Sequence, residues 1–252
     1  MKMLKRKWQL LIKSFCLVLI LIIARVIIDY YNLDVITINS ITSALVTGVI
    51  FTIAVIFTGT LTDYKESEKI PSELAASIKS LYLDSYMFPT VKQEVIDQFK
   101  SHIRNLHKEV VSNFRLNTWD LTSLNDVTQE INRDISTLSL ENVAPPILVK
   151  MRNELTTIDR TFNRIKQIKD TDFIPAAYAI SEMAITFVIL ILLFIKSDSL
   201  IESVLLIAAI TAMITGLFFL IKDMDDPFEI GVGSSADVDL FLLFDLDQYL
   251  KD

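Results

Sequence analysis

The chain has 252 residues, of which 52% are hydrophobic, and it contains only 5 Gly and 6 Pro. This composition excludes collagen-like, linker-rich and disordered chains, and a mean hydropathy of +0.45 argues against a soluble globule. The net charge of -7 gives no electrostatic reason to bind nucleic acid. A single cysteine, Cys16, excludes an intramolecular disulfide and a cysteine-based zinc site.

The first apolar stretch covers residues 8–28, and we predict that it crosses the membrane. Its uncharged core, residues 14–24, lies between Lys13 and Arg25, so both charged side chains must reach toward the membrane surface. So short a core after a basic N-terminus is also typical of a signal peptide, but no small-residue cleavage site follows Ala24. Arg25 is therefore either an intramembrane charge or a residue at the level of the lipid headgroups.

The second stretch, residues 41–61, lies within a run from 35 to 62 that has no charged residue. Backbone at that depth must satisfy its own hydrogen bonds, so we predict a membrane helix. Val49, Ile53 and Phe57 are spaced four apart and form one stripe along this helix. In an oligomer such a stripe would narrow a water path to a hydrophobic neck. The alternative is that the stripe packs against other helices or lipid.

Residues 62–172 are predicted to be helical, because their apolar residues recur at intervals of three and four. The distribution of basic residues, described below, places this helical domain in the cytoplasm. The first part, to about residue 83, continues the second span and places Asp63 and Glu66 on its polar side. Pro71 is expected to kink this stretch. Pro89 and Pro145 lie at the starts of two stripes, where a missing N–H costs nothing. The stripes are Val91, Val95, Phe99, Ile103, Leu106, Val110 and Phe114; Leu121, Leu124, Val127, Ile131, Ile135 and Leu138; and Met151, Leu155, Ile158, Phe162, Ile165 and Ile168.

Residues 173–222 form a second membrane hairpin, with spans at about 176–195 and 203–221. The span at 203–221 has no charged residue, whereas the span at 176–195 contains Glu182. An acid inside the membrane is costly unless it faces water or a partner, which indicates a pore, vestibule or subunit contact. If the span begins later than residue 176, Glu182 instead lies at the headgroup level.

The basic residues indicate which way the chain crosses the membrane. Four of the first seven residues are Lys or Arg, whereas the connection from 29 to 40 has neither. Positive charge stays on the cytoplasmic side, so both termini are expected in the cytoplasm. The sequence therefore predicts an all-α, multi-pass protein of the cell inner or plasma membrane, in contact with membrane lipid. Its parts are residues 1–61, 62–172, 173–222 and an acidic cytoplasmic tail at 223–252.

Catalytic and metal-binding patterns are missing from this sequence. The histidines, His102 and His107, are five residues apart, which turns them about 140 degrees from each other on a helix. Nucleotide-binding glycine motifs, nucleophile elbows and zinc-protease motifs do not occur, so we do not expect an enzyme or a cofactor. Asp237 and Asp239 in the tail are the best candidates for calcium ligands, although their spacing does not match an EF-hand and solvated charge is the alternative.

Two segments resemble the bestrophin family and its bestrophin-like branch of four-span proteins. Residues 57–74, FTGTLTDYKESEKIPSEL, are similar to the bestrophin junction where the pore-lining second helix enters the cytoplasm. Residues 220–231, LIKDMDDPFEIG, with DVDL at 237–240, resemble the family's Pro-Phe element and acidic stretch. Arg160 and Arg164 look like the paired arginines of that branch. The chain differs from bestrophins in three places. The residues of the junction are different, and Glu229 follows Pro-Phe. The uninterrupted run of acidic residues that binds calcium in bestrophins is absent from this sequence.

This resemblance implies a homopentameric channel for small monovalent ions, with the second span around the axis. Val49, Ile53 and Phe57 would then form the neck, and Asp63 and Glu66 the inner mouth. Similarity to animal bestrophins suggests anions such as chloride, whereas acids at the mouth would attract cations. The rival function is a non-conducting membrane scaffold or sensor whose cytoplasmic helices bind a partner.

Overall fold

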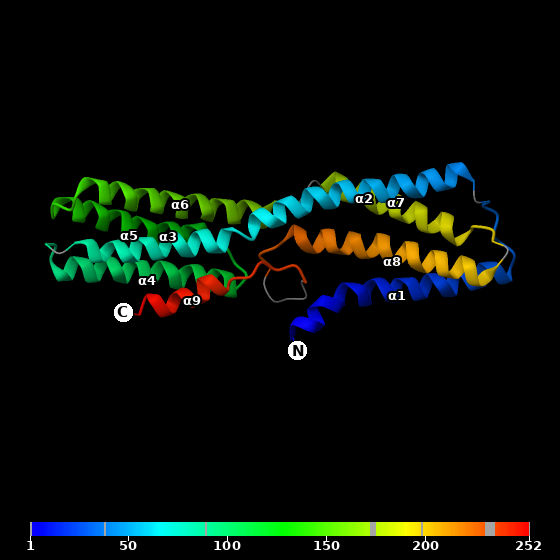
Figure 1. The fold of residues 1–252 in the computed structure, drawn as a ribbon, viewed down its shortest axis with the longest axis horizontal. Coiled ribbons are helices and arrows are strands. Elements are labelled where there is room, and N and C mark those ends of the chain that lie inside the picture. Colours follow the sequence, from blue (N-terminus) through cyan, green and yellow to red (C-terminus); the bar gives the residue numbers. More distant parts are fainter. Residues whose placement is uncertain are drawn as a thin grey trace. The chain divides into compact units, whose positions relative to one another are not determined.

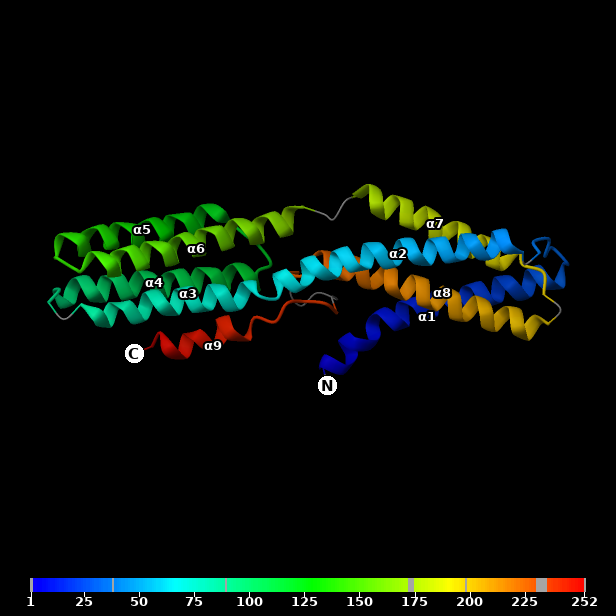
Figure 2. The same cartoon turned by 45° about the horizontal axis from the view of Figure 1, so that its top comes forward.

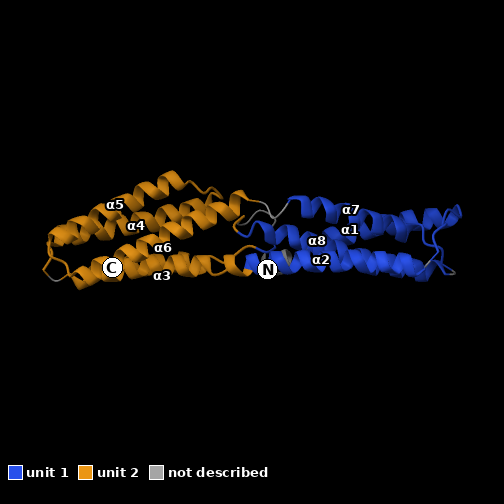
Figure 3. Ribbon diagram, turned by 90° about the horizontal axis from the view of Figure 1, so that it is seen from above, with its two compact units in different colours: residues 1–64, 172–227, 231–236 blue, residues 65–171, 228–230, 237–252 orange. Residues whose placement is uncertain are grey.

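The protein is all-α, as predicted, in a computed structural model that describes residues 2–37, 39–88, 90–171, 175–197, 199–229 and 235–251 (Figure 1). For residues 2–7 and 9 only the backbone is described. The predicted helix start at Pro89 lies outside the described residues. The chain divides into two compact units, which are considered separately (Figure 3). Unit 1 contains residues 1–64, 172–227 and 231–236, and unit 2 contains 65–171, 228–230 and 237–252.

Unit 1 is built from long apolar helices. These are α1 (Lys2–Tyr30), α2 (Ser40–Ser67), α7 (Pro175–Leu193) and α8 (Leu200–Asp225). Within the described residues, four helices are long and apolar enough to cross a membrane, which confirms the predicted number. Helices are expected here because a helix satisfies its backbone hydrogen bonds internally in lipid. Helix α1 packs along α8 (Figures 1 and 2).

The two connections at one end of unit 1 are joined by backbone hydrogen bonds. The Ile36 amide, between α1 and α2, donates to the carbonyl of Phe194 at 2.9 Å. The Lys196 amide, after α7, donates to the carbonyl of Ile36 at 2.7 Å. These bonds form a parallel bridge between Ile36 and Ile195. They fix the separation of the α1–α2 and α7–α8 hairpins at this end.

Unit 2 is a helical bundle. It comprises α3 (Ile70–Asp84), a 3-10 turn (Ser85–Met87), α4 (Gln93–Arg115), α5 (Leu121–Leu140), α6 (Pro145–Asp170) and α9 (Phe241–Tyr249). Helix α3 packs against α6, α6 against α5, and α5 against α4. The predicted stripes supply the core, since Phe99, Ile103, Ile131, Ile158 and Phe162 are almost completely buried. Burial of these stripes is the main force that stabilises the bundle.

The predicted continuous helix from the second span to residue 83 is interrupted. Helix α2 ends at Ser67 and α3 begins at Ile70, with a turn between them. Pro71 has no N–H, and its ring clashes with the carbonyl four residues earlier, which belongs to Ser67. The proline therefore begins a new helix instead of kinking the old one.

The end of the acidic tail is an ordered part of unit 2. Helix α9 packs against α3 and α4 through buried leucines such as Leu243 and Leu246. Two backbone carbonyls accept hydrogen bonds from α4: His107 Nε2 donates to Leu243 O of α9 at 2.7 Å, and Arg104 Nε donates to O of Leu250, the residue after α9, at 2.6 Å. The sequence shows an acidic tail with an apolar patch, but not the surface on which that patch is buried.

Candidate functional site

The expected neck stripe on α2 faces the apolar core of unit 1. Ile53 is only 2% exposed, Val49 is buried beside it, and both belong to an apolar cluster with α7 and α8. That cluster includes Val188 of α7 and Ile214 of α8. Phe57 is partly buried against the same cluster. A residue in this core cannot line a water path in this conformation. The burial of these residues therefore disagrees with the neck that spacing predicts at Val49, Ile53 and Phe57.

The opposite face of α2 is open. Phe51 is 69% exposed and Val55 is 56% exposed, and a side chain added at Gly48 would meet no other atom within 4 Å. At 100 degrees per residue, Phe51 and Val55 lie about 160 degrees from Ile53 around the helix axis. The exposed face also carries small and hydroxyl side chains: Ala44, Thr47, Ala54, Thr58 and Thr62.

The threonine hydroxyls on this face are already satisfied. Thr47, Thr58 and Thr62 donate to the carbonyls four residues earlier in α2, at 2.8 to 2.9 Å. Each hydroxyl oxygen can still accept a hydrogen bond from outside the helix. The face can therefore border water or a neighbouring helix without leaving a polar donor unpaired.

The two acids expected at the inner mouth lie at the end of α2, where both are exposed. Glu66 forms an ion pair, because Arg164 NH2 on α6 donates to its Oε2 at 3.1 Å. Part of the negative charge predicted there is therefore offset by an arginine. The sequence showed both residues but not the pairing, since they are 98 positions apart.

Glu182 on α7 has a partner that the sequence analysis missed. Lys222 Nζ on α8 donates to Glu182 Oε1 at 2.5 Å, and both side chains are about half exposed. The same ammonium lies 5.0 Å from the centre of the Phe218 ring. An acid and a base near the ends of two adjacent apolar helices are a signal for such a pair, because each needs a counter-ion close to lipid.

Arg25, which we expect either inside the membrane or at the headgroup level, has a fully buried side chain. Its Nε donates to Ser203 Oγ at 3.2 Å, and its NH1 donates to Leu193 O at 3.0 Å. Its NH2 lies 3.7 Å from Asp29 Oδ1 and 3.8 Å from Asp34 Oδ2, which are ion-pair distances too long for hydrogen bonds. The guanidinium thus joins α1 to α7, α8 and the α1–α2 connection.

The calcium candidates in the tail have different local roles. Asp239 Oδ1 accepts a hydrogen bond from the Phe241 amide at 3.0 Å, at the start of α9. Asp237 is partly buried. In the part of the chain that the structure describes, no group of three or more His, Cys, Asp or Glu side chains could hold a metal ion. Calcium binding at these residues stays a prediction, and the neighbouring Gly231 and Gly233 lie outside the described residues.

Comparison with solved structures identifies the fold. A bacterial bestrophin homologue from Klebsiella pneumoniae, in a point-mutant crystal structure, aligns with 100% of both chains at a TM-score of 0.71 and 13% identity. Another crystal structure of that homologue aligns with 95% of this chain and 96% of its own, at 0.76 and 12%. A crystal structure described only as a membrane protein variant aligns with 99% of this chain and 97% of its own, at 0.75 and 13%.

These matches confirm the resemblance to bestrophins at the level of the fold. The chain is a multi-pass membrane protein. It has the fold of the bacterial bestrophin homologue over nearly its full length. The sequence itself matches no family model and no curated protein.

Proposed function

We propose that the protein is a bestrophin-type subunit of an oligomeric ion channel, in which the face of α2 containing Phe51 and Val55 lines the pore. The fold is consistent with such a channel. The observation that carries the proposal is the chemistry of this exposed face, which is uncharged from Ala44 to Thr62 and rich in small and hydroxyl residues. This assignment replaces the stripe through Ile53.

A comparison with α1 supports the assignment. The exposed side chains of α1 are almost all bulky and apolar, as expected for contact with acyl chains: Leu11, Ile12, Phe15, Leu19, Ile20 and Ile23. The exposed face of α2 instead presents Gly48, Thr58 and Thr62. Small and hydroxyl residues favour close helix contacts and tolerate water. The α2 face is therefore the better candidate for the centre of an oligomer.

Phe51 and Val55 are one turn apart on this face and would form successive rings in an oligomer. Rings of bulky apolar side chains restrict a pore by dewetting, so they would act as the hydrophobic neck. Five subunits is the number that the bestrophin resemblance implies. The basic N-terminal segment favours both termini in the cytoplasm.

The ions are proposed to be small and monovalent, and the charge at the mouth bears on their sign. Glu66 is offset by Arg164, so it attracts cations less than an unpaired acid would. Asp63 is exposed on the same helix. The local charge is therefore more balanced than the sequence alone suggests. The reversal potential under a salt gradient measures whether the permeant ion is a cation or an anion.

Bilayer recording of the purified protein tests the proposal. We expect conductance, and we expect Phe51→Ala to increase it severalfold because the ring at the neck becomes wider and wetter. The matched control is Phe187→Ala on α7, where the phenylalanine is 54% exposed but lies on another helix. An absence of conductance from a reconstituted oligomer, or equal effects of the two substitutions, would favour the scaffold function instead.

A further inference from the structure

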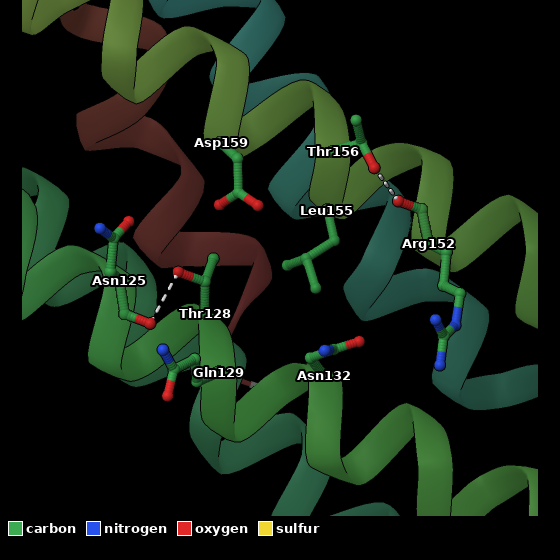
Figure 4. A pocket seen from close by; sticks show the side chains of 8 residues that line it. All are labelled: Asn125, Thr128, Gln129, Asn132, Arg152, Leu155, Thr156 and Asp159. Atoms are coloured by element: carbon green, nitrogen blue, oxygen red, sulfur yellow. Dashed lines mark hydrogen bonds between the residues drawn. The ribbon is translucent and has the colours of Figure 1, made fainter.

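A polar groove lies between α5 and α6 in unit 2. It has a volume of about 380 Å³. Both helices contribute side chains, and those at its two ends differ in charge (Figure 4). The lining residues are Asn125, Thr128, Gln129 and Asn132 of α5, and Arg152, Leu155, Thr156 and Asp159 of α6.

Asp159 places a carboxylate in this groove without a counter-ion. The carboxylate points from α6 toward α5 and is half-buried (Figure 4). Burial raises the pKa of Asp159 above its ordinary value. Across the described residues, no hydrogen bond or ion pair to this carboxylate occurs. A cationic group entering the groove would therefore meet an acid whose charge nothing else offsets.

Arg152 is the opposite charge at the other end. It precedes Asp159 by seven residues on the same helix, so their backbones are about 10.5 Å apart along the axis. Neither charge forms an ion pair with any group that the structure describes. Elsewhere in this unit, exposed charges within reach do pair, as in Lys166 with Asp170 at 2.9 Å. The groove thus keeps a cation and an anion apart.

Amide side chains occupy the α5 wall between the two charges. Asn125, Gln129 and Asn132 follow each other along one face of the helix. Within the described part of the chain, these amides make no hydrogen bond to another protein group, so each offers a donor and an acceptor. The hydroxyl of Thr128 is already used, because it donates to Leu124 O at 2.7 Å.

We propose that this groove binds a small zwitterion of the short-peptide class, with its ammonium at Asp159, its carboxylate at Arg152 and its amide groups against the asparagines and glutamine of α5. An extended chain rises by about 3.3 to 3.6 Å per residue, so about three residues span the charges. A simple cation would contact only Asp159 and a simple anion only Arg152, whereas a zwitterion of this length contacts both charges. The helical bundle of unit 2 would then bind a ligand in addition to its structural role.

Calorimetric titration of the full-length protein in detergent with triglycine tests this assignment. We expect saturable binding that weakens by about tenfold when the peptide is N-acetylated, and by a similar factor when its carboxylate is amidated, because each change removes one charge-assisted contact. Asp159→Asn and Arg152→Gln should each reproduce one of these losses. In Asp159→Asn the preference for the free amine should disappear.

Matched controls lie on the same helix outside the groove. Glu154→Gln and Arg160→Gln remove one acid and one base from α6 without touching the lining. Both should bind triglycine as the parent protein does. Specific recognition should already be detectable when the triglycine concentration is about 10 mM. If triglycine at this concentration does not bind the parent protein, the proposal is overturned. Equal binding of the free and capped peptides would overturn it as well. The readout is binding, so it does not depend on ion conduction.

Discussion

The guanidinium of Arg25 on α1 donates a hydrogen bond from Nε to Ser203 Oγ on α8 at 3.2 Å, and both residues are buried. The same side chain binds Leu193 O at the end of α7. A buried charge is tolerated only when its partners are in place, so this arginine fixes the relative positions of three membrane helices.

Replacing Arg25 by Met is expected to destabilise unit 1. The substitution removes the guanidinium and leaves Ser203, Leu193 O and two nearby acids without their common partner, at a cost of about 3 kcal/mol. Thermal unfolding in detergent measures the change. Lys13→Met is the control, because Lys13 is an exposed base on the same helix. An equal shift in both variants would contradict a special role for Arg25.

The substitution Ile53→Ala separates the two faces of α2. Because Ile53 is enclosed by α7 and α8, it should lose about 2 to 5 kcal/mol of stability through the cavity it leaves. It should not widen the pore. The measurement combines thermal unfolding with the bilayer current per reconstituted protein. A stable variant with raised current would restore the neck that spacing alone predicted.

Cysteine accessibility distinguishes water from lipid on the exposed face of α2. In a Cys16→Ser background, which removes the native cysteine, Thr58→Cys, on the exposed face of α2 outside the proposed neck, should react with a charged, water-soluble thiol reagent, because only an aqueous thiol ionises readily. Leu190→Cys, on an exposed position of α7, should stay unreactive in lipid. Equal reactivity at both positions would argue against a pore along α2.

The pair Glu182 and Lys222 is suited to a double-mutant cycle. Glu182→Gln and Lys222→Met should each destabilise unit 1, and the double variant should recover about 1 kcal/mol relative to their sum. The expected coupling is modest because both side chains are about half exposed. The coupling free energy is obtained from the unfolding free energies of the parent protein, the two single variants and the double variant. If the effects of the two substitutions are strictly additive, the contact does not stabilise the fold.

Asp159 should make unit 2 less stable as the pH rises. Its folded-state pKa lies above the ordinary value of 3.8, so between those two values the folded state binds more protons than the unfolded state. Stability from this group therefore falls as the pH increases through that window and is lowest above it. Asp159→Asn should be more stable than the parent protein at neutral pH, and this gain should shrink as the pH approaches 3.8.

Denaturant unfolding of both proteins across that pH range measures this difference. Other groups titrate in the same range, so only the difference between the two proteins is interpreted. A gain that is constant with pH would contradict the assignment of the raised pKa to burial of this carboxylate. A residue that weakens stability while supporting ligand binding is typical of a functional site.

Periodicity and charge placement determined most of the secondary structure. Long apolar runs predicted four membrane helices, and the stripes through Phe99, Ile131 and Phe162 predicted the buried faces of the bundle, because both patterns are local consequences of burial. Spacing could not show which face of α2 packs inward, since Ile53 and Phe51 lie on opposite faces that both carry large apolar side chains.

Only the tertiary structure decided the partners of the charges. The contacts of Arg25 with Ser203, of Glu66 with Arg164 and of Glu182 with Lys222 join residues 40 to 178 positions apart. Such pairings depend on how whole helices pack against each other. This packing is determined by the free energy of many contacts together, so it cannot be predicted from any short segment. The sequence thus determined where helices form, and the packing determined which of their side chains are free to act.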